Sequence, residues 1–140
     1  MSWFCWALLS AFFAGLTAVL AKIGVTAINS NLATAVRTTV VLLFAWGIVF
    51  CTNTLAPLLT LSPRTWTFLV LSGLATGLSW LCYFRALQLG EASRVAPVDK
   101  LSVVFAILFA VTLLHEKLTW QQGVGGAFVV IGAITLAIRF

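Results

Sequence analysis

The side chains that could carry out chemistry in this 140-residue sequence are few. They comprise eight lysines or arginines, one histidine and three carboxylates, namely Glu91, Asp99 and Glu116. Acid–base or two-metal catalysis needs at least two such groups converging on one point, and these carboxylates fall on different helices or loops. His115 stands alone beside Glu116, and the sequence contains no GxSxG, P-loop or DxxD motif. We therefore predict no enzyme, no metal site and no cofactor.

The composition indicates a lipid environment. Hydrophobic residues make up 62% of the sequence and charged residues 8%, whereas a soluble domain carries about 25% charged residues. A soluble fold of this size could not bury so much apolar surface. The formal charge is +5, but the basic residues are scattered singly, which is unlike a nucleic-acid interface. Cys5, Cys51 and Cys82 lie within apolar runs, where cysteine usually acts as a small hydrophobe.

Five apolar stretches are each long enough to cross a bilayer as a helix, which takes about 20 residues. The connections between them are short, so consecutive helices must run antiparallel as neighbours. The first stretch has no basic segment before it and exceeds a signal-peptide core, so we expect it to be retained. We predict an all-α integral membrane protein with one transmembrane domain over residues 1–140. The expected helices cover residues 3–28, 32–52, 65–88, 92–114 and 120–138.

Small residues recur at four-residue spacing on several of these helices, a pattern that lets helix backbones approach closely in lipid. The third helix carries Gly73 and Gly77 at this spacing. The fifth carries the pairs Gly123 with Ala127 and Ala133 with Ala137, and three further glycines, Gly125, Gly126 and Gly132. Two alternatives explain such glycine faces: packing between helices of this chain, or packing against a second chain.

Several motifs lie between Trp80 and Gly132. They are Trp80-Leu-Cys-Tyr83-Phe-Arg85-Ala-Leu87, Gly90-Glu-Ala-Ser93-Arg-Val-Ala-Pro97, Val95-Ala-Pro97-Val-Asp99-Lys100-Leu-Ser102 and Leu114-His115-Glu116-Lys117-Leu118, followed by Gln122-Gly123, Gly126 and Ile131-Gly132. Together they resemble the EamA domain, the five-helix repeat of the drug/metabolite transporter superfamily. The Val95–Ser102 segment is most similar to short bacterial members with a single repeat. His115 is one departure, since the family commonly has glycine before the glutamate.

The resemblance implies a secondary transporter, exporter-like, that moves small metabolites or drugs across the lipid bilayer by alternating access. Ten-helix members join two repeats in inverted orientation around a central cavity, so a single repeat implies a dimer. The partner would be an antiparallel second copy or an inverted homologue. The alternative is a non-transporting membrane subunit that stabilises or regulates a partner transporter. The small multidrug resistance family fits less well, because its essential first-helix glutamate has no counterpart here.

Charged residues inside the expected helices are candidates for the transport path, since each costs about 2.5–3.5 kcal/mol at a helix centre. At 1.5 Å per residue they form a layer about 5–12 Å from the membrane face that holds the first and third loops. Asp99 is the predicted central residue, because its side chain is too short to snorkel to the headgroups. The other charged members, for which snorkelling is the alternative, are Lys22, Arg37, Arg85 and Lys100. Trp80 and Tyr83 are either cavity-lining or plain packing residues.

Pro97 lies two residues before Asp99. It removes a backbone hydrogen bond and would kink a helix that runs from Ala92, and kinked helices line substrate sites in transporters. In the alternative, Pro97 marks the start of the helix. Asp99 would then be an N-terminal residue favoured by the helix dipole.

The positive-inside rule gives the expected orientation. One side of the predicted bundle holds six basic residues and the other holds two. This places the N-terminus outside and the C-terminus in the cytoplasm of a bacterial inner membrane. Counting loop and terminal residues alone gives two on each side, which leaves insertion in both orientations open. The first set is Lys22, Arg37, Arg85, Arg94, Lys100 and Arg139, and the second is Arg64 and Lys117.

Overall fold

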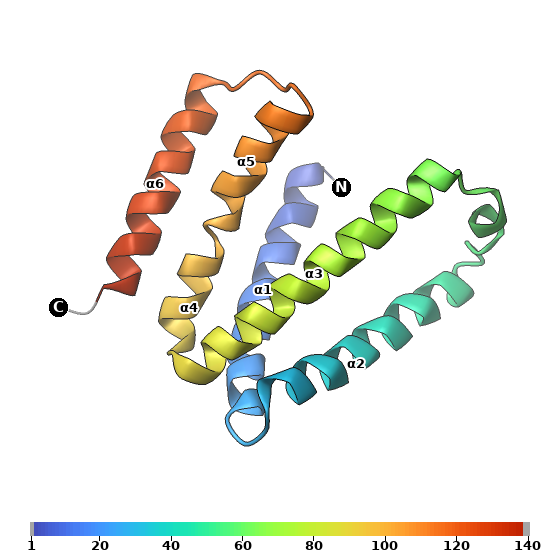
Figure 1. Ribbon diagram of the computed structural model, residues 1–140, viewed down its shortest axis with the longest axis horizontal. Helices are drawn as coiled ribbons and strands as arrows, with labels where there is room; N and C mark the ends of the chain where they lie inside the picture. The colour runs from blue at the N-terminus through green and yellow to red at the C-terminus, as the bar shows by residue number, and fades with distance from the viewer. Residues whose placement is uncertain (1, 139–140) are drawn as a thin grey trace. The chain divides into compact units, whose positions relative to one another are not determined.

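The computed structural model describes residues 2–138, and these residues form helices and no strand (Figure 1). Five segments are long and apolar enough to cross a membrane, which confirms the predicted all-α membrane fold. A short 3-10 helix, η1 (Ala56–Thr60), lies between the second and third spans. The spans are α1 (Trp3–Val25), α2 (Ser30–Cys51), α3 (Pro63–Leu89), α4 (Ala92–Asp99) continued by α5 (Ser102–Leu113), and α6 (Trp120–Ala137).

Local capping chemistry sets where two of these helices begin. The Asn29 side chain accepts a hydrogen bond from the Asn31 amide at 2.8 Å, so α2 starts at Ser30, two residues before the expected position 32. At the start of α6, the Thr119 hydroxyl accepts from the Gln122 amide at 3.3 Å. The side-chain Oε1 of Gln122 in turn accepts from the Thr119 backbone amide at 2.9 Å, which completes a capping box.

Two helices end at a residue in the left-handed backbone region. Asn53 follows α2 with φ 51°, and His115 follows α5 with φ 54°. After α2, the Thr54 amide donates to the Val49 carbonyl at 3.2 Å, which satisfies a carbonyl that the helix leaves open. Glycine is the residue that best tolerates this conformation. His115 stands where the resembled family commonly has glycine, and its backbone conformation is one that glycine adopts at lower cost.

The fourth span is broken, and the break differs from the expected kink at Pro97. Helix α4 continues through Pro97 to Asp99, and α5 begins at Ser102. Between them the chain makes tight turns in which the Lys100 amide donates to the Pro97 carbonyl at 3.1 Å. The predicted span over residues 92–114 is confirmed as Ala92–Leu113. The predicted site of the irregularity, Pro97, was wrong by three residues, because the α-helix is interrupted at residues 100 and 101. The alternative start after Pro97 was also wrong, because Asp99 is the last residue of α4.

The chain divides into two compact units, which we describe separately. Unit 1 comprises Met1–Ile23 and Leu89–Phe140, and unit 2 comprises Gly24–Gln88. In unit 1, α6 packs along α4 and α5 (Figure 1). In unit 2, the start of α2 lies beside the end of α3. The buried residues of unit 2 include Val25, Ser30, Ala33, Thr34, Phe84 and Leu87.

The glycine faces take little part in packing within the units. Within the described part of its own unit, no side chain or neighbouring helix lies within 4 Å of the Cβ position at Gly73, Gly77, Gly123 or Gly132. At Gly126 the nearest atom is Cδ1 of Ile107 at 3.9 Å, an ordinary contact. Packing inside either unit therefore does not account for the pair Gly73 and Gly77 or for the glycines of α6.

Candidate functional site

Arg37 occupies a position deep in the second span. It follows Ser30 by seven residues, which places it about 10 Å along the helix. Its guanidinium carbon lies 4.4 Å from the ring centroid of Trp80 and 5.4 Å from that of Phe84. A cation within about 6 Å of an aromatic face is attracted by the ring quadrupole. We call these three residues the Arg37 clamp, which joins α2 to α3 inside the membrane span.

The spacing of the aromatic residues explains why both rings meet the same cation. Trp80 and Phe84 are four residues apart on α3 and so share one helix face. Phe84 is only 3% exposed, which fixes its ring. Tyr83 lies beside it, with ring centroids 6.4 Å apart. Two of the predicted path residues, Arg37 and Trp80, are therefore in direct contact in unit 2, and a third, Tyr83, lies beside the Phe84 ring.

Phe84 was not predicted as a site residue. One apolar ring among many in an apolar helix carries no signal of its own. Two features of the sequence could have indicated it. Phe84 follows Trp80 by four residues, and the span before their helix contains an isolated arginine, Arg37.

Arg85 makes a different contact from Arg37. Its Nη1 donates to Oε1 of Gln88 at 2.7 Å, and Nε2 of Gln88 donates to the carbonyl of Ile28 at 3.1 Å. The Arg85 side chain thus points along α3 toward the end of that helix, as a snorkelling arginine does. This geometry favours a role in fastening α3 to the connection before α2.

Lys22 also makes a contact at a helix end. Its Nζ donates to the Gly90 carbonyl at 2.7 Å, which ties α1 to the connection between α3 and α4 within unit 1. Helix α1 ends at Val25, three residues earlier than the expected residue 28. Lys22 therefore lies in the last turn, about 5 Å from the helix end rather than the expected 8–10 Å.

Asp99 and Lys100 form an ion pair at the break in the fourth span. Oδ2 of Asp99 lies 3.5 Å from Nζ of Lys100, and the two side chains are 36% and 56% exposed. Asp99 is about 10 Å along the span from Ala92. Irregular backbone at such depth is tolerated only where protein buries it or where it lines a water-filled cavity. The opposite, N-terminal end of α4 carries a second pair, Glu91 with Arg94, at 3.2 Å.

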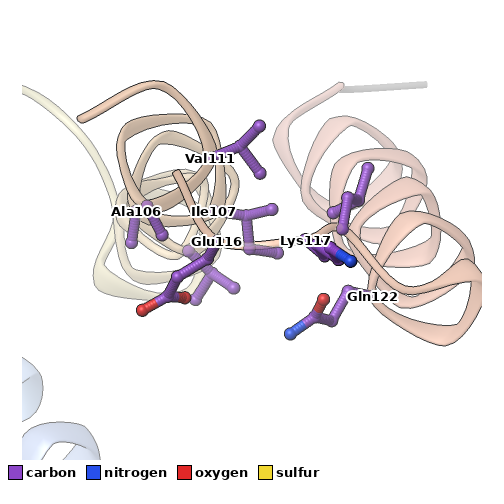
Figure 2. Close-up of a pocket in the computed structure, with 9 residues that line it drawn as sticks. Ala106, Ile107, Val111, Glu116, Lys117 and Gln122 are labelled. Atoms are coloured by element: carbon purple, nitrogen blue, oxygen red, sulfur yellow. The ribbon is translucent and has the colours of Figure 1, made fainter. Parts of the chain in front are cut away.

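A pocket of about 310 Å³ opens at the other end of the α5–α6 hairpin. Its wall is apolar, and three polar side chains from the α5–α6 connection and the first turn of α6 stand around it. Figure 2 shows the carboxylate of Glu116 and the amide of Gln122 extending from the same side of the pocket. The lining residues are Val103, Ala106, Ile107, Ala110, Val111, Glu116, Lys117, Leu118 and Gln122. None of them was a predicted path residue.

The described acids, cysteines and histidine form no group of three that could hold a metal ion. Two polar groups lie inside the spans: the Arg37 clamp in unit 2 and the Asp99–Lys100 pair in unit 1. These can bind charged groups and exchange ionic partners.

Comparison with known proteins identifies the class to which this arrangement belongs. Residues 1–138 match the EamA-like transporter family, and the chain belongs to that family. A relative from Sinorhizobium sp., named an uncharacterized transporter in the cobO 3′ region, is 55% identical over 137 residues. The match covers 98% of this chain and 97% of the relative. The chain is thus a multi-pass membrane protein of a transporter family, which confirms the resemblance drawn from the motifs.

Two more distant relatives match parts of the chain. A probable 4-amino-4-deoxy-L-arabinose-phosphoundecaprenol flippase subunit, ArnE, from Enterobacter sp. (strain 638) is 32% identical over 73 residues, covering 52% of this chain and 68% of its own. An uncharacterized protein of Methanocaldococcus jannaschii is 27% identical over 105 residues, covering 69% and 77%. No solved structure matches the chain significantly.

Proposed function

We propose that this protein is one half of a secondary transporter that exports small metabolites or drugs by alternating access and works as a dimer. The observation that carries the proposal is the broken fourth span with the Asp99–Lys100 pair at the break. Two partly exposed charges at a depth of about 10 Å are costly against lipid tails. The pair is therefore expected to face a water-filled path or a second chain.

Asp99 is the proposed central residue of the path. A carboxylate beside a lysine can exchange that partner for a proton or for a cationic group of the substrate. Discontinuous helices form the substrate and ion sites of other transporters, where they place polar backbone beside the ligand. We include Lys100, Arg37, Trp80 and Tyr83 in the path. Lys22 and Arg85 have structural contacts that compete with that role.

The dimer supplies the second half of the cavity. The open glycine faces of α3 and α6 are the proposed contact surfaces, because their Cβ positions have room for a neighbouring backbone. The partner is an antiparallel second copy or an inverted homologue.

We place the protein in a bacterial inner membrane with the C-terminus in the cytoplasm. Arg139, one of the residues behind this orientation, lies outside the described residues. A reporter active only in the cytoplasm, fused after Phe140, should give a signal. Silence there, with a signal from the same reporter fused before Met1, would reverse the orientation.

The alternative function is a non-transporting subunit that stabilises or regulates a partner transporter. Its support is the similarity over 52% of the chain to a protein named a flippase subunit. A subunit of that kind would need its partner for any transport.

Efflux from proteoliposomes that contain the purified chain tests the proposal. A panel of metabolites and drugs is loaded inside, with and without a proton gradient, and release is compared with that from empty liposomes. We expect release of at least one compound. Release that requires co-reconstitution with a second protein other than a homologous half would establish the subunit alternative.

A further inference from the structure

The two units differ in their acidic residues. Residues 24–88, which make up unit 2, contain Arg37, Arg64 and Arg85 but no aspartate or glutamate. The three carboxylates of the sequence all belong to unit 1, where Asp99 is paired with Lys100 and Glu91 with Arg94. Arg37, which joins α2 to α3, thus has no carboxylate partner among the described residues of its own unit.

The contacts of Arg37 leave its hydrogen-bonding groups available. The contacts with the Trp80 and Phe84 rings neutralise little of the guanidinium charge. Among the described residues of unit 2, Arg37 makes no hydrogen bond and no ion pair. A guanidinium carries five N–H donors in a planar fork, which matches the paired oxygens of a carboxylate or a phosphate. The rings also hold the fork in place, which reduces the entropy lost on binding.

We propose that the Arg37 clamp binds the carboxylate or phosphate group of an organic anion, and that such anions are the substrate class of this transporter. Arg37 forms a two-point contact with the anionic group, while Trp80 and Tyr83 contact the apolar part of the same molecule. That these anions are transported substrates rests on the proposed transport function. Anion binding by Arg37 can be measured without transport.

Binding is measured by thermal stabilisation of the full chain in nanodiscs of a zwitterionic lipid. The probes are benzoate and phenyl phosphate, with phenyltrimethylammonium as the cationic counterpart of similar size. We expect both anions to raise the Tm and the cation to leave it unchanged. Arg37→Gln should weaken anion binding about ten-fold or more, because a charge-assisted contact is lost. Arg37→Lys keeps the charge without the fork, so it should retain part of the affinity and bind carboxylate and phosphate more weakly than the wild-type chain.

Arg64→Gln is the matched control. Arg64 lies in the first turn of α3, where its guanidinium carbon is 5.9 Å from the Phe68 ring, and so it repeats the cation–ring contact at a helix end. The control should bind benzoate as the wild type does. Equal stabilisation of the wild type and Arg37→Gln would overturn the inference. So would stabilisation by phosphatidylglycerol in the nanodisc but by neither soluble probe, since the clamp would then hold a lipid headgroup.

The Arg37 clamp could instead hold a carboxylate from elsewhere in the protein. A double-mutant cycle that combines Arg37→Gln with Asp99→Asn detects such a contact. Additive changes in Tm are expected if Arg37 is free for a ligand. A strong interaction between the two substitutions would show that Asp99, from the same or a second chain, neutralises Arg37, which would overturn the inference. Anion binding without any efflux would contradict the proposed function and leave the clamp's anion site standing.

Discussion

The two units of this protein stabilise charge inside a membrane span by different means. In unit 1, Asp99 and Lys100 form a pair of opposite charges at a break in the helix. In unit 2, Arg37 lies against two aromatic rings in an unbroken helix, and the unit has no carboxylate to offer it. An ion pair is neutral overall and changes state by exchanging a partner. A stacked guanidinium stays positive and attracts an anion. This difference is the basis of our proposals that the pair in unit 1 exchanges ionic partners and that Arg37 in unit 2 binds an anion.

The largest expected effect comes from removing the exchangeable carboxylate. Asp99→Asn keeps the shape of the side chain and removes its charge, so we expect transport in proteoliposomes to be abolished while membrane insertion and protein level stay near normal. Asp99→Glu should keep partial activity. Parallel loss of protein and activity in the Asn variant would indicate a structural salt bridge. Full transport would place the site elsewhere.

The next effect concerns the glycine face in unit 2. Gly77→Leu fills a position that is open within the unit, so the single chain should insert normally. A close contact between helices at that position would be blocked, and crosslinking in native membranes should trap several-fold less of the dimer. Gly47→Leu is the control, since it fills an equally open position on α2 outside the GxxxG pattern. Equal crosslinking in both variants would exclude the α3 face from the interface.

A smaller effect separates the two arginine–ring contacts of unit 2. Trp80→Leu removes the nearer ring from Arg37, which should lower the free energy of unfolding by about 1–2 kcal/mol because the cation is partly desolvated. Phe68→Leu removes the ring beside Arg64 at the start of α3, where solvent screens the charge, and should cost less than about 0.5 kcal/mol. Unfolding of both variants in mixed micelles with increasing denaturant checks the difference. Equal losses would mean that Arg37 gains nothing from its position between two helices.

Much of the fold could be predicted from sequence, because span length and apolar composition are local properties. The same holds for Arg37 and Trp80, since a charge or an indole deep in an apolar stretch stands out. An irregularity in the fourth span was predicted at Pro97, but its position after Asp99 was not, because a proline removes one donor without fixing which later residue leaves the helix. The partners of Lys22 and Arg85 depend on helix ends and on distant carbonyls, which no sequence pattern specifies.

The smallest effect tests the left-handed residues that end α5 in unit 1 and α2 in unit 2. His115 at φ 54° should carry a conformational cost of about 1 kcal/mol, which glycine avoids. His115→Gly should therefore leave the Tm unchanged or raise it, and His115→Val should lower it, since a β-branched side chain is least tolerated there. Asn53→Gly is the comparison in unit 2, and it should change the Tm less, because asparagine already tolerates φ 51°. A fall in Tm for His115→Gly larger than that for Asn53→Gly would show that the imidazole makes a stabilising contact that outweighs the backbone cost.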